Sequence, residues 1–424
     1  MGSSGGPTVG IDIGSRYIKV VELAPGRNGA TVRALGIAPT PAEAVDSGII
    51  TDPKALGAAV KQLLKSSGIS TRRSVSSVAG QGALVVRVIE VPKMSDAELA
   101  ETMRWEVERH VPFAADEVIM DFQAVPRSEE DGDSENMEVL MAVAQQEMVD
   151  RHLTMLYAAG LRPAAIDVEP LAAARALIEL GPDPYAKKTT AIVNIGASCT
   201  DVGIFRDGIL AFPRTLPLAG DTMTNAVMQQ LQVDEGQAEE LKTAHGSVLM
   251  SAAPAVAAPP ATEGFYDLSA GQPDASSAAP IDFDLGEASA EQPESSLAVT
   301  EAGDDSSHRI FMAIAPTLAE LVTEIRRSIE YYTGRVPDGS VDEILLCGGT
   351  AGLKNLDQFL SAELGVPTRV ADAFKYTTVS TRNYSAEDVR ALSPSFAVAV
   401  GLAARDMIAV PARPRVKPAK RGKK

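Results

Sequence analysis

Residues 9–23 read VGIDIGSRYIKVVEL, and residues 191–205 read AIVNIGASCTDVGIF. Each stretch is an alternating apolar strand, a turn with glycine at the third position of D/N-x-G, and a second strand, which is the pattern of a β-hairpin. Because the turn residues are small, their main-chain N–H groups are open to an anion such as a phosphate. One such hairpin is common in proteins, but two of them predict duplicated halves that hold a polyphosphate in the cleft between them.

The composition predicts a large, reduced, cytoplasmic protein. With 424 residues and 45% apolar content, the chain can bury cores for two or more domains. Cys199 and Cys347 lie in apolar runs and are expected to be buried thiols rather than a disulfide. The four histidines lack the spacing of metal ligands. We find no secretory signal and no apolar run of about 20 residues, the length that a membrane span requires.

The net charge of −17 is unevenly distributed. Residues 245–308 carry eleven acidic residues and no Lys or Arg, so we expect an acidic disordered loop, either a passive insertion or a tether for basic partners. Residues 411–424 carry seven basic residues and no acidic one, a tail suited to contact anionic lipid headgroups. The acidic balance argues against nucleic acid as the main partner.

The order of the elements predicts two lobes and an insertion. The capping box Ser95-x-x-Glu98 opens a helix inside a compact stretch that mixes strands and helices. We expect a first lobe of residues 7–82 and 161–188, an inserted α+β subdomain of residues 83–160, a second lobe of residues 189–244 and 309–393, and a final helix at 394–409 that packs back on the first lobe.

Several polar residues near the glycine turns are candidates for chemistry. Asp12 follows the first strand and can ligate Mg²⁺ or its waters, since hard cations prefer oxygen ligands. Lys19 either reaches a phosphate or is a solvated strand residue. Residues 348–350 (GGT) form a third glycine turn, which either packs against a nucleoside or simply joins a strand to a helix. Glu239 and Lys242 form either a solvent-side ion pair or a pincer over a nucleoside.

Together these motifs resemble the actin-like ATPase superfamily. The first stretch resembles its phosphate-1 hairpin and the second its phosphate-2 hairpin. LLCGGTAGLKNLDQFL at residues 345–360 is similar to the adenosine motif, and AEELK at residues 238–242 is similar to the purine-contacting E-x-x-K of the seventy-kilodalton chaperones. VEPLAAARAL at residues 168–177 is similar to the segment that links the two halves.

Within this superfamily, three runs look most like the PilM family of type IV pilus assembly: DIGSRYIKVVEL, VPKMSDAEL with EVERHVPF, and AAIDVEPLA. The resemblance covers nearly the whole chain outside the acidic segment and the tail. It implies an α/β protein of actin-like ATPase fold, with two duplicated α/β lobes around a nucleotide cleft. The inserted α+β subdomain at residues 83–160 resembles that of the division protein FtsA.

The resemblance also implies a function. PilM proteins bind ATP with Mg²⁺ and bind the short cytoplasmic N-terminal peptide of the membrane protein PilN, in a groove involving the inserted subdomain. They link the motor side of the pilus machine, which drives twitching motility, to its inner-membrane alignment complex. We therefore expect a cytoplasmic scaffold, ring-forming in the assembled machine, held at the inner membrane by partners or by its tail. The alternatives are an FtsA-like division or cytoskeletal homologue and an actin-like-fold small-molecule kinase.

Matching positions give the implied ATP-binding residues. Phosphate or metal contacts are implied for Asp12, Gly14, Ser15, Arg16 and Lys19 in the first hairpin, and for Gly196, Ala197, Ser198 and Thr200 in the second. Nucleoside contacts are implied for Gly220, Glu239, Lys242, Gly348, Gly349, Thr350 and Leu353.

One position departs from the superfamily pattern. Asn194 stands where the phosphate-2 turn usually begins with Asp. An amide can hydrogen-bond a metal-bound water, but it brings no charge and cannot act as a general base. Glu169 is then the only matched carboxylate for activating water. We therefore expect ATP binding with slow or absent hydrolysis.

Overall fold

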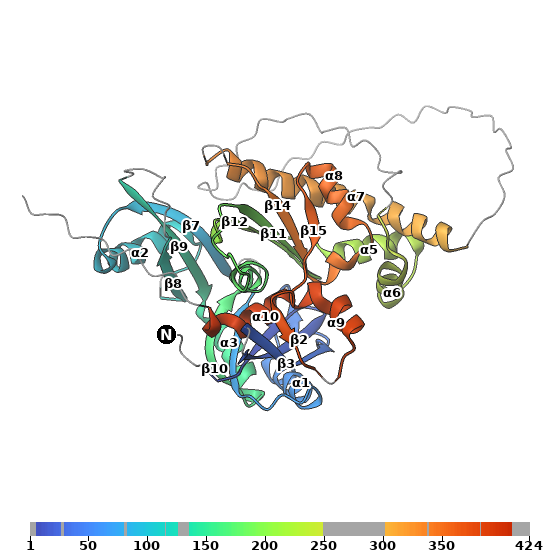
Figure 1. Ribbon diagram of the computed structural model, residues 1–424, viewed down its shortest axis with the longest axis horizontal. Helices are drawn as coiled ribbons and strands as arrows, with labels where there is room; N and C mark the ends of the chain where they lie inside the picture. The colour runs from blue at the N-terminus through green and yellow to red at the C-terminus, as the bar shows by residue number, and fades with distance from the viewer. Residues whose placement is uncertain are drawn as a thin grey trace, which may run out of the picture.

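The structure, a computed structural model, describes residues 6–26, 29–79, 83–114, 116–125, 135–248, 302–336, 339–381 and 383–408. These residues form two α/β lobes and a smaller α+β unit (Figure 1). The basic tail and most of the acidic segment, on which two of the predictions fall, lie outside the described residues.

The first lobe is a six-stranded sheet covered by helices on both faces (Figure 1). β1 is antiparallel to β2 and parallel to β6. Every residue of β1 is buried, because α1 and α3 cover one face of the sheet and α4 and α10 the other. The sheet order is β10 (Arg162–Val168), β6 (Arg73–Val78), β1 (Thr8–Ile13), β2 (Tyr17–Gly26), β3 (Gly29–Pro39) and β16 (Thr377–Val379). The helices are α1 (Pro53–Ser66), α3 (Gln146–Ala158), α4 (Glu169–Ala174) and α10 (Ala397–Ala404).

The second lobe repeats this connectivity, with three antiparallel strands followed by two parallel ones. Its sheet order is β13 (Ile209–Leu216), β12 (Thr200–Arg206), β11 (Thr189–Ile195), β14 (Glu343–Cys347) and β15 (Thr368–Val370). Around this sheet lie α5 (Gly220–Leu231), α6 (Glu235–His245), α7 (Ala302–Thr333) and α8 (Leu356–Leu364). The predicted duplication of an α/β lobe is confirmed.

The inserted unit has its own small sheet and core. Its sheet order is β7 (Leu84–Pro92), β9 (Asn136–Gln145) and β8 (Val118–Ala124), and α2 (Asp96–His110) packs on it. The predicted capping box is present. The main-chain N–H of Ser95 donates to the carboxylate of Glu98 at 2.8 Å, and the hydroxyl of Ser95 accepts from the main chain of Glu98 at 3.4 Å.

The inserted unit ends earlier than the sequence suggested. Met155 and Leu156 of α3 are buried in the core of the first lobe, although the prediction assigned this helix to the insertion. At Gly57 of α1, an added Cβ would lie 2.6 Å from the Cβ of Ala158, so α1 and α3 pack almost backbone to backbone. An amphipathic pattern shows that α3 packs on something, but it does not identify the partner element.

Two boundaries of the second lobe also differ from expectation. β16 pairs with β3, so the chain re-enters the first lobe well before residue 393. α7 begins at Ala302. At the other end of the segment, Ser247 forms a β-bridge with Lys354, and the next residue, Val248, is fully buried. The ends of the segment predicted to be disordered, residues 245–248 and 302–308, are therefore ordered, and its remainder lies outside the described residues.

Close backbone contact fixes α10 on the first lobe. A Cβ at Gly401 would lie 1.6 Å from the carbonyl of Ala172 in α4, and one at Gly10 would lie 2.1 Å from the carbonyl of Ala399. Only glycine permits these approaches. The last described helix thus packs against β1 and α4, next to the interlobe cleft described below.

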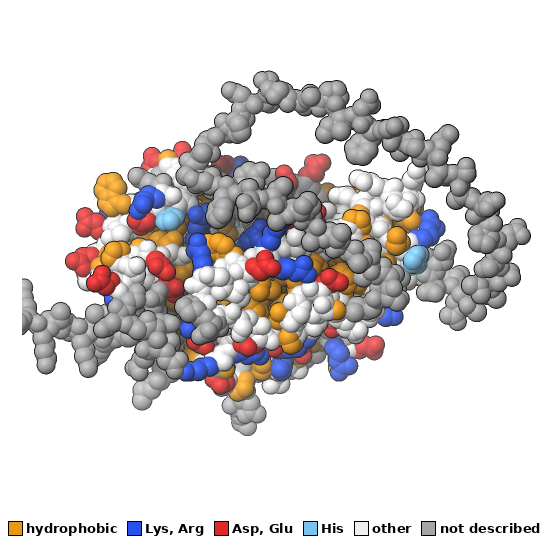
Figure 2. Space-filling view, turned by 90° about the horizontal axis from the view of Figure 1, so that it is seen from above, with side chains coloured by type: hydrophobic (Ala, Val, Ile, Leu, Met, Phe, Trp, Pro, Cys, Tyr) orange, Lys and Arg blue, Asp and Glu red, His pale blue; other side chains and the backbone are white. Residues whose placement is uncertain are grey.

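The described surface mixes charged side chains of both signs with apolar ones (Figure 2). Across the residues that the structure describes, no helix combines the length and the apolarity that crossing a bilayer demands. The two cysteines are free thiols: Cys347 is buried as expected, whereas Cys199 is half-buried.

Candidate functional site

A cleft of about 850 Å³ lies between the two lobes. Both glycine-turn hairpins, the start of α4, α6 and the turn after β14 contribute to its lining. The predicted site residues that line it are Asp12, Gly14, Ser15, Arg16, Lys19, Glu169, Asn194, Gly196, Ala197, Ser198, Gly220, Glu239, Lys242, Gly348, Gly349, Thr350 and Leu353. Sequence positions far apart are therefore brought to one place, and only Thr200 is missing from it.

The first hairpin presents a close ion pair to the cleft. Asp12 of β1 and Lys19 of β2 are direct partners in the antiparallel register, so their side chains lie on the same face of the sheet. The ammonium of Lys19 donates to the carboxylate of Asp12 at 2.8 Å, and both side chains are largely buried. The alternative that Lys19 is a solvated strand residue is wrong.

The second hairpin has the same geometry but different chemistry. Asn194 of β11 is the direct partner of Asp201 of β12, with the same spacing as the pair in the first hairpin. Asp201 lines the cleft, and the sequence interpretation missed it. The sequence could have identified Asp201, because aligning the two hairpins at their glycine turns makes Asp201 equivalent to Lys19.

Three carboxyl groups approach one another beneath this hairpin. Burial, followed by the charges of Asp201 and Asp12, raises the pKa of the Glu169 carboxyl well above its usual range. Burial also raises the pKa of Asp201, whose carboxylate accepts from the hydroxyl of Thr215 at 2.6 Å. The amide of Asn194 donates to Glu169 at 3.4 Å. Glu169 therefore retains its proton at pH values where an ordinary carboxyl is charged, and a bound cation would take the place of that proton.

The two turns leave main-chain donors unused. Each is closed by the same hydrogen bond, from the N–H of Gly14 to the carbonyl of Tyr17 at 3.1 Å and from Gly196 to Cys199 at 3.0 Å. Within the described residues, the following turn N–H groups donate no hydrogen bond: those of Ser15, Arg16, Ala197 and Ser198. Unsatisfied N–H groups on both sides of a cleft are the donor set that phosphate oxygens accept from.

Thr200 does not belong to the site. Its side chain is fully buried, and its hydroxyl donates to the carbonyl of Leu218 at 2.6 Å. Successive residues of a strand point to opposite faces, so Asp201 faces the cleft and Thr200 faces away. The predicted phosphate contact of Thr200 is wrong.

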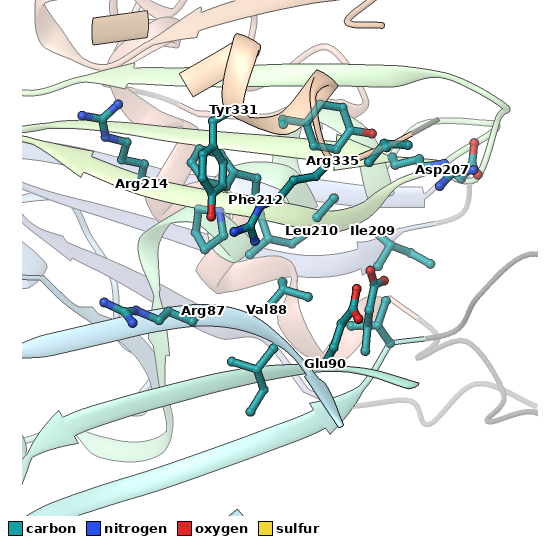
Figure 3. Close-up of a pocket in the computed structure, with 18 of the residues that line it drawn as sticks. Arg87, Val88, Glu90, Asp207, Ile209, Leu210, Phe212, Arg214, Tyr331 and Arg335 are labelled. Carbon is teal, nitrogen blue, oxygen red and sulfur yellow. The ribbon is translucent and has the colours of Figure 1, made fainter. Parts of the chain in front are cut away.

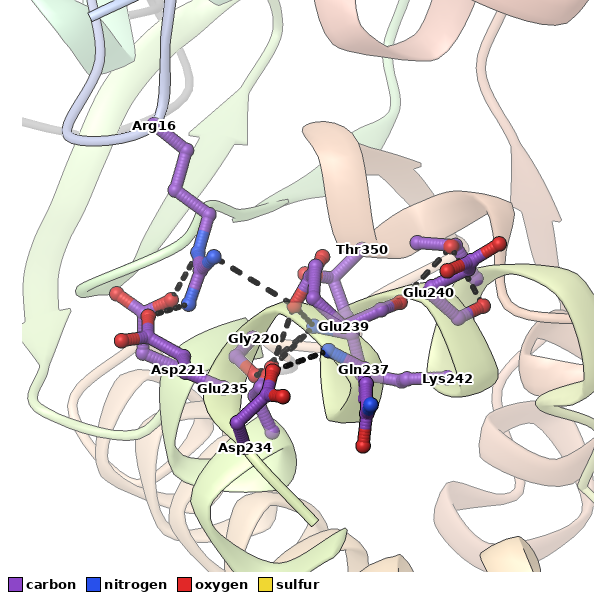
Figure 4. Close-up of polar contacts among 12 residues, drawn as sticks. Arg16, Gly220, Asp221, Asp234, Glu235, Gln237, Glu239, Glu240, Lys242 and Thr350 are labelled. Atoms are coloured by element: carbon purple, nitrogen blue, oxygen red, sulfur yellow. Dashed lines mark hydrogen bonds and ion pairs between the residues drawn. The ribbon is translucent and has the colours of Figure 1, made fainter. Parts of the chain in front are cut away.

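Arg16 reaches from the first hairpin to acidic side chains of the second lobe (Figure 4). Its guanidinium donates to Asp221 of α5 at 2.5 Å and to Glu235 of α6 at 2.8 Å. Glu239 lies 3.9 Å away. Beside it, the hydroxyls of Ser15 and Ser198 are 2.9 Å apart. These contacts join the first lobe to the second, and Arg16 is engaged by acidic side chains rather than open to a phosphate.

Glu239 and Lys242 form an ion pair at 2.7 Å inside the cleft. Lys242 is only 6% exposed and also donates to the carbonyl of Gly220 at 3.0 Å. Burial opposes ionisation of Glu239, but hydrogen bonds from Lys242 and Thr224, with the charges of Lys242 and Arg16, outweigh it and lower the pKa of the Glu239 carboxyl. The reading as a solvent-side pair is wrong.

The third glycine turn has a structural reason for its glycine. Gly348 has a φ of +90°, and a Cβ there would lie 2.3 Å from the carbonyl of Ile195. Gly349, by contrast, has open space where a Cβ would stand. The hydroxyl of Thr350 donates to the carbonyl of Gly196 at 3.0 Å, which ties this turn to the glycine turn of the second hairpin.

The residues of the cleft fit a nucleoside triphosphate with its metal ion. The volume is within the range of about 300–1,000 Å³ found for ligand pockets, and the unused N–H groups supply anion donors. Within the part of the chain that the structure describes, no group of three or more His, Cys, Asp or Glu is arranged to hold a metal by itself. Mg²⁺ keeps several waters and takes one or two protein ligands beside phosphate oxygens; Asp12 and Asn194 would supply them, Asn194 through water.

Comparison with known proteins identifies relatives of the whole chain. A family profile described as type IV pilus assembly protein PilM matches residues 10–252 and 287–407, most of the sequence. A solved structure described as a PilM-PilN type IV pilus biogenesis complex is similar with a TM-score of 0.73 and 28% identity, over 94% of this chain and 98% of that one.

Two further matches are weaker or shorter. The ethanolamine utilization protein EutJ from Carboxydothermus hydrogenoformans shares the fold, with a TM-score of 0.50 and 14% identity over 95% of this chain and 91% of that one. The cell division protein FtsA from Porphyromonas gingivalis is 37% identical over 90 residues, which span 21% of this chain and 18% of that protein.

Proposed function

The chain belongs to the PilM family of type IV pilus assembly proteins, and from this premise we propose that it is an ATP-binding scaffold of the pilus machine. The observation that supports ATP binding most directly is the pair of facing turns, each with two unused N–H groups, at one interlobe cleft. The actin-like fold places such turns on either side of a nucleotide, and every predicted contact except Thr200 lines the cleft.

In this proposal, each residue type has one task. The turn N–H groups and Lys19 hold the phosphates. Asp12 and Asn194 hold Mg²⁺, which, when bound, supplies charge neutralisation to the phosphates and to Glu169. Lys242 and Glu239 fix the side of the cleft that receives the nucleoside, with Gly220 beneath them.

We propose that hydrolysis is slow or absent. Asn194 stands where the superfamily pattern has an acid, and an amide lacks a charge and cannot act as a general base. The site therefore lacks the carboxylate that the pattern places at this position. Turnover faster than about 1 per second, which is ordinary for enzymes, would contradict this part of the proposal.

For the partner, we propose the cytoplasmic N-terminal peptide of PilN, bound in a groove involving the inserted unit. A PilM-PilN complex is the solved structure described above. ATP would close the lobes and favour one partner-binding shape, since a ligand shifts a conformational equilibrium by its differential affinity for the two states. The protein would then act in the cytoplasm, in contact with other inner-membrane and motor components, with the membrane reached through those partners or through its tail, and as a ring in the assembled machine.

The test is titration of the full chain with a fluorescent ATP analogue and Mg²⁺, with and without a PilN peptide. We expect saturable binding that Lys19→Ala abolishes and that Lys61→Ala, on an exposed position of α1, leaves unchanged. The peptide should bind with different affinities in the two nucleotide states. Absence of analogue binding would refute the ATP proposal, and identical peptide affinity in both states would refute the gating.

A further inference from the structure

The edge of the first lobe that lies opposite the cleft carries several arginines. Strands β1, β6 and β10 are parallel, so all three begin at this edge, and Ala79 and Glu169, which follow β6 and β10, line the cleft at the other edge. The six residues of β1 separate the two edges by roughly 20 Å, at the usual rise of a strand. Arg73 and Arg162 are the first residues of β6 and β10 and are paired in the parallel register, and Arg72 precedes β6.

Two of these arginines have no acidic partner. Arg72 and Arg162 are exposed, and within the residues that the structure describes neither forms an ion pair. The main-chain N–H of Arg162 donates to the carbonyl of Arg72 at 2.7 Å, which holds the two residues side by side. Arg73 is paired with Asp406 at 2.6 Å, and its side chain remains 50% exposed. Because Glu22, near this edge, is only 8% exposed, the exposed charge here is positive in a chain of net charge −17.

The basic tail begins at the same edge. The ion pair between Arg73 and Asp406 holds the last described turn, Arg405–Met407, against the start of β6. The described residues end at Ile408, and residues 411–424 carry seven basic residues and no acidic one. The tail therefore starts a few residues past the arginines of the edge, and it carries charge of the same sign.

An exposed aromatic side chain accompanies the arginines. Tyr157 lies in the last turn of α3 and is 62% exposed. Only residues 159–161 separate α3 from the start of β10, so the end of this helix lies at the same edge of the sheet. Tyrosine has an apolar ring with a polar hydroxyl, a combination that is enriched at membrane interfaces. Arginine matches the phosphate oxygens of lipid headgroups.

Four residues define this basic edge: Arg72, Arg73, Tyr157 and Arg162. We propose that the basic edge, together with the tail, docks on an anionic lipid surface. The guanidinium groups contact lipid phosphates, and the ring of Tyr157 lies among the headgroups. A tail alone anchors the chain without orienting it, whereas the basic edge fixes which side of the first lobe faces the lipid. The inference deepens only the membrane contact of the proposed function, and neither ATP nor the PilN peptide enters it.

This orientation keeps both large cavities of the described structure away from the lipid. The cleft lies at the opposite edge of the sheet. A groove of about 1,390 Å³ between the inserted unit and the second lobe, with Arg87 and Arg214 among its lining residues, includes no residue of the basic edge (Figure 3). Acidic side chains elsewhere on the protein are repelled by anionic lipid, but beyond about 8 Å this repulsion is largely screened at physiological salt.

The first test is co-sedimentation of the full chain with vesicles of equal parts phosphatidylcholine and phosphatidylglycerol. We expect binding to these vesicles and none to vesicles of phosphatidylcholine alone. In the double variant Arg72→Glu with Arg162→Glu, the partition coefficient should fall at least about tenfold, because two attractive charges become repulsive. A DNA duplex at the same phosphate concentration should leave the unaltered protein on the vesicles, and displacement by the duplex would reassign the basic edge to nucleic acid.

The matched control is the double variant Arg104→Glu with Arg390→Glu. It makes the same charge change on exposed arginines of α2 and α9 (Ala386–Leu392), and neither arginine has an ion pair among the described residues. Leu392 lines the cleft, so α9 ends on the side away from the basic edge. The control should lower the partition coefficient by less than about threefold, because its charges are screened from the lipid.

Two outcomes of this comparison would overturn the proposal. An equal loss in both double variants would mean that only the net charge of the protein matters. An unchanged partition coefficient in the Arg72→Glu with Arg162→Glu variant would mean that the tail binds lipid without the basic edge. Equal binding to neutral and anionic vesicles would also contradict a contact made by guanidinium groups.

A second test reports the orientation through fluorescence. The chain has one tryptophan, Trp105, which is 67% exposed on α2. In the unaltered protein, its emission should stay the same when anionic vesicles are added. In the double variant Trp105→Phe with Tyr157→Trp, the introduced indole should shift its emission to shorter wavelengths, because it enters the lipid interface. No shift from position 157, or a shift of Trp105, would overturn the proposed orientation.

Failure of this inference is distinguishable from failure of the proposed function. Vesicle binding is measured without nucleotide or peptide, and the ATP-analogue titration contains no lipid. Analogue binding in a protein whose vesicle binding does not depend on Arg72 and Arg162 rejects the basic edge alone. Vesicle binding that depends on these arginines, in a protein that does not bind the analogue, rejects the ATP proposal alone.

Discussion

The hairpins β1–β2 and β11–β12 have the same backbone hydrogen bonding but different side-chain chemistry. Both are closed by one hydrogen bond from a glycine N–H to the carbonyl three residues on, and in both, two further N–H groups donate no hydrogen bond within the described part of the chain. At the paired position, the first has Asp12 against Lys19 and the second has Asn194 against Asp201. The backbone supplies N–H donors for an anion twice, whereas the side chains make one side an ion pair with no net charge and the other a crowded acidic pocket.

The two hairpins therefore differ in how far their charges are balanced without a ligand. The Asp12–Lys19 pair is complete without a ligand, since each charge satisfies the other at 2.8 Å. The pocket around Asp201 and Glu169 is incomplete, because two acids share a buried site and one of them keeps a proton. We infer that the first side is preformed and that the second responds to a cation and to pH.

The largest effect is expected from breaking the preformed side. Asp12→Ala leaves the ammonium of Lys19 buried without its partner, which costs roughly 3–5 kcal/mol of stability for a buried pair. It should also abolish binding of Mg²⁺ with the ATP analogue. Urea unfolding and analogue titration measure the two effects.

The matched change on the second side is Asn194→Ala, which removes only a 3.4 Å hydrogen bond to Glu169. It should cost about 1 kcal/mol, the value of a typical net hydrogen bond. If the two alanine variants proved equally destabilised, the contrast between a preformed side and an incomplete side would be wrong.

Asn194→Asp should give the second hairpin a general base for ATP hydrolysis. The new carboxylate adds the charge that the superfamily pattern has at this position, and a positioned general base contributes about 10²–10⁴-fold to rate. We expect ATP turnover to rise by at least about tenfold, measured by phosphate release, and we expect the protein to become less stable until Mg²⁺ is added. A stable variant with no gain in turnover would show that more than the base is missing.

Glu169 should give nucleotide binding a pH dependence. Its pKa in the folded protein lies above that of the unfolded chain, so its contribution to folding stability is present at low pH and is lost as the pH rises through the folded-state pKa. Mg²⁺ relieves the repulsion, so binding of Mg²⁺ with the analogue should release a proton and tighten with rising pH, by up to about tenfold per pH unit.

Glu169→Gln has no proton to release and provides the control. The affinity of this variant for the analogue should vary little across the pH range in which the unaltered protein binds the analogue more tightly. Isothermal titration calorimetry in buffers of different ionisation enthalpy measures the affinity and the number of protons released. A pH profile that is the same in both proteins would assign the titration to another group.

The smallest effect is expected at the mouth of the cleft, where Arg16 joins the lobes. Its ion pairs to Asp221 and Glu235 are partly exposed, and such pairs contribute about 0–1 kcal/mol. Arg16→Ala should therefore speed dissociation of the ATP analogue by about two- to fivefold at low salt, with a smaller difference at high salt. Stopped-flow displacement measures the rate. Slower dissociation in the variant would mean that Arg16 does not hold the lobes together.

Much of the site was predictable because local patterns encode turns. The turn positions of Gly14 and Gly196 require a small residue, and the repeated spacing around them predicted two matching hairpins. The prediction for Thr200 failed because it followed the motif and not the alternation of β12. The ion pairs of Arg16 could not be predicted, because its partners, Asp221 and Glu235, come from α5 and α6, whose approach no local pattern records.

The sequence by itself determined the duplicated hairpins, the glycine turns and the family, since these depend on residues adjacent in the chain. Tertiary structure alone decided that α3 joins the first lobe, that β16 returns to it, and that Arg16 spans the cleft. The same holds for the acidic pocket, because the raised pKa of Glu169 comes from burial and from two carboxylates of different strands. Packing and electrostatics act through space, and distances through space are set only when the chain has folded.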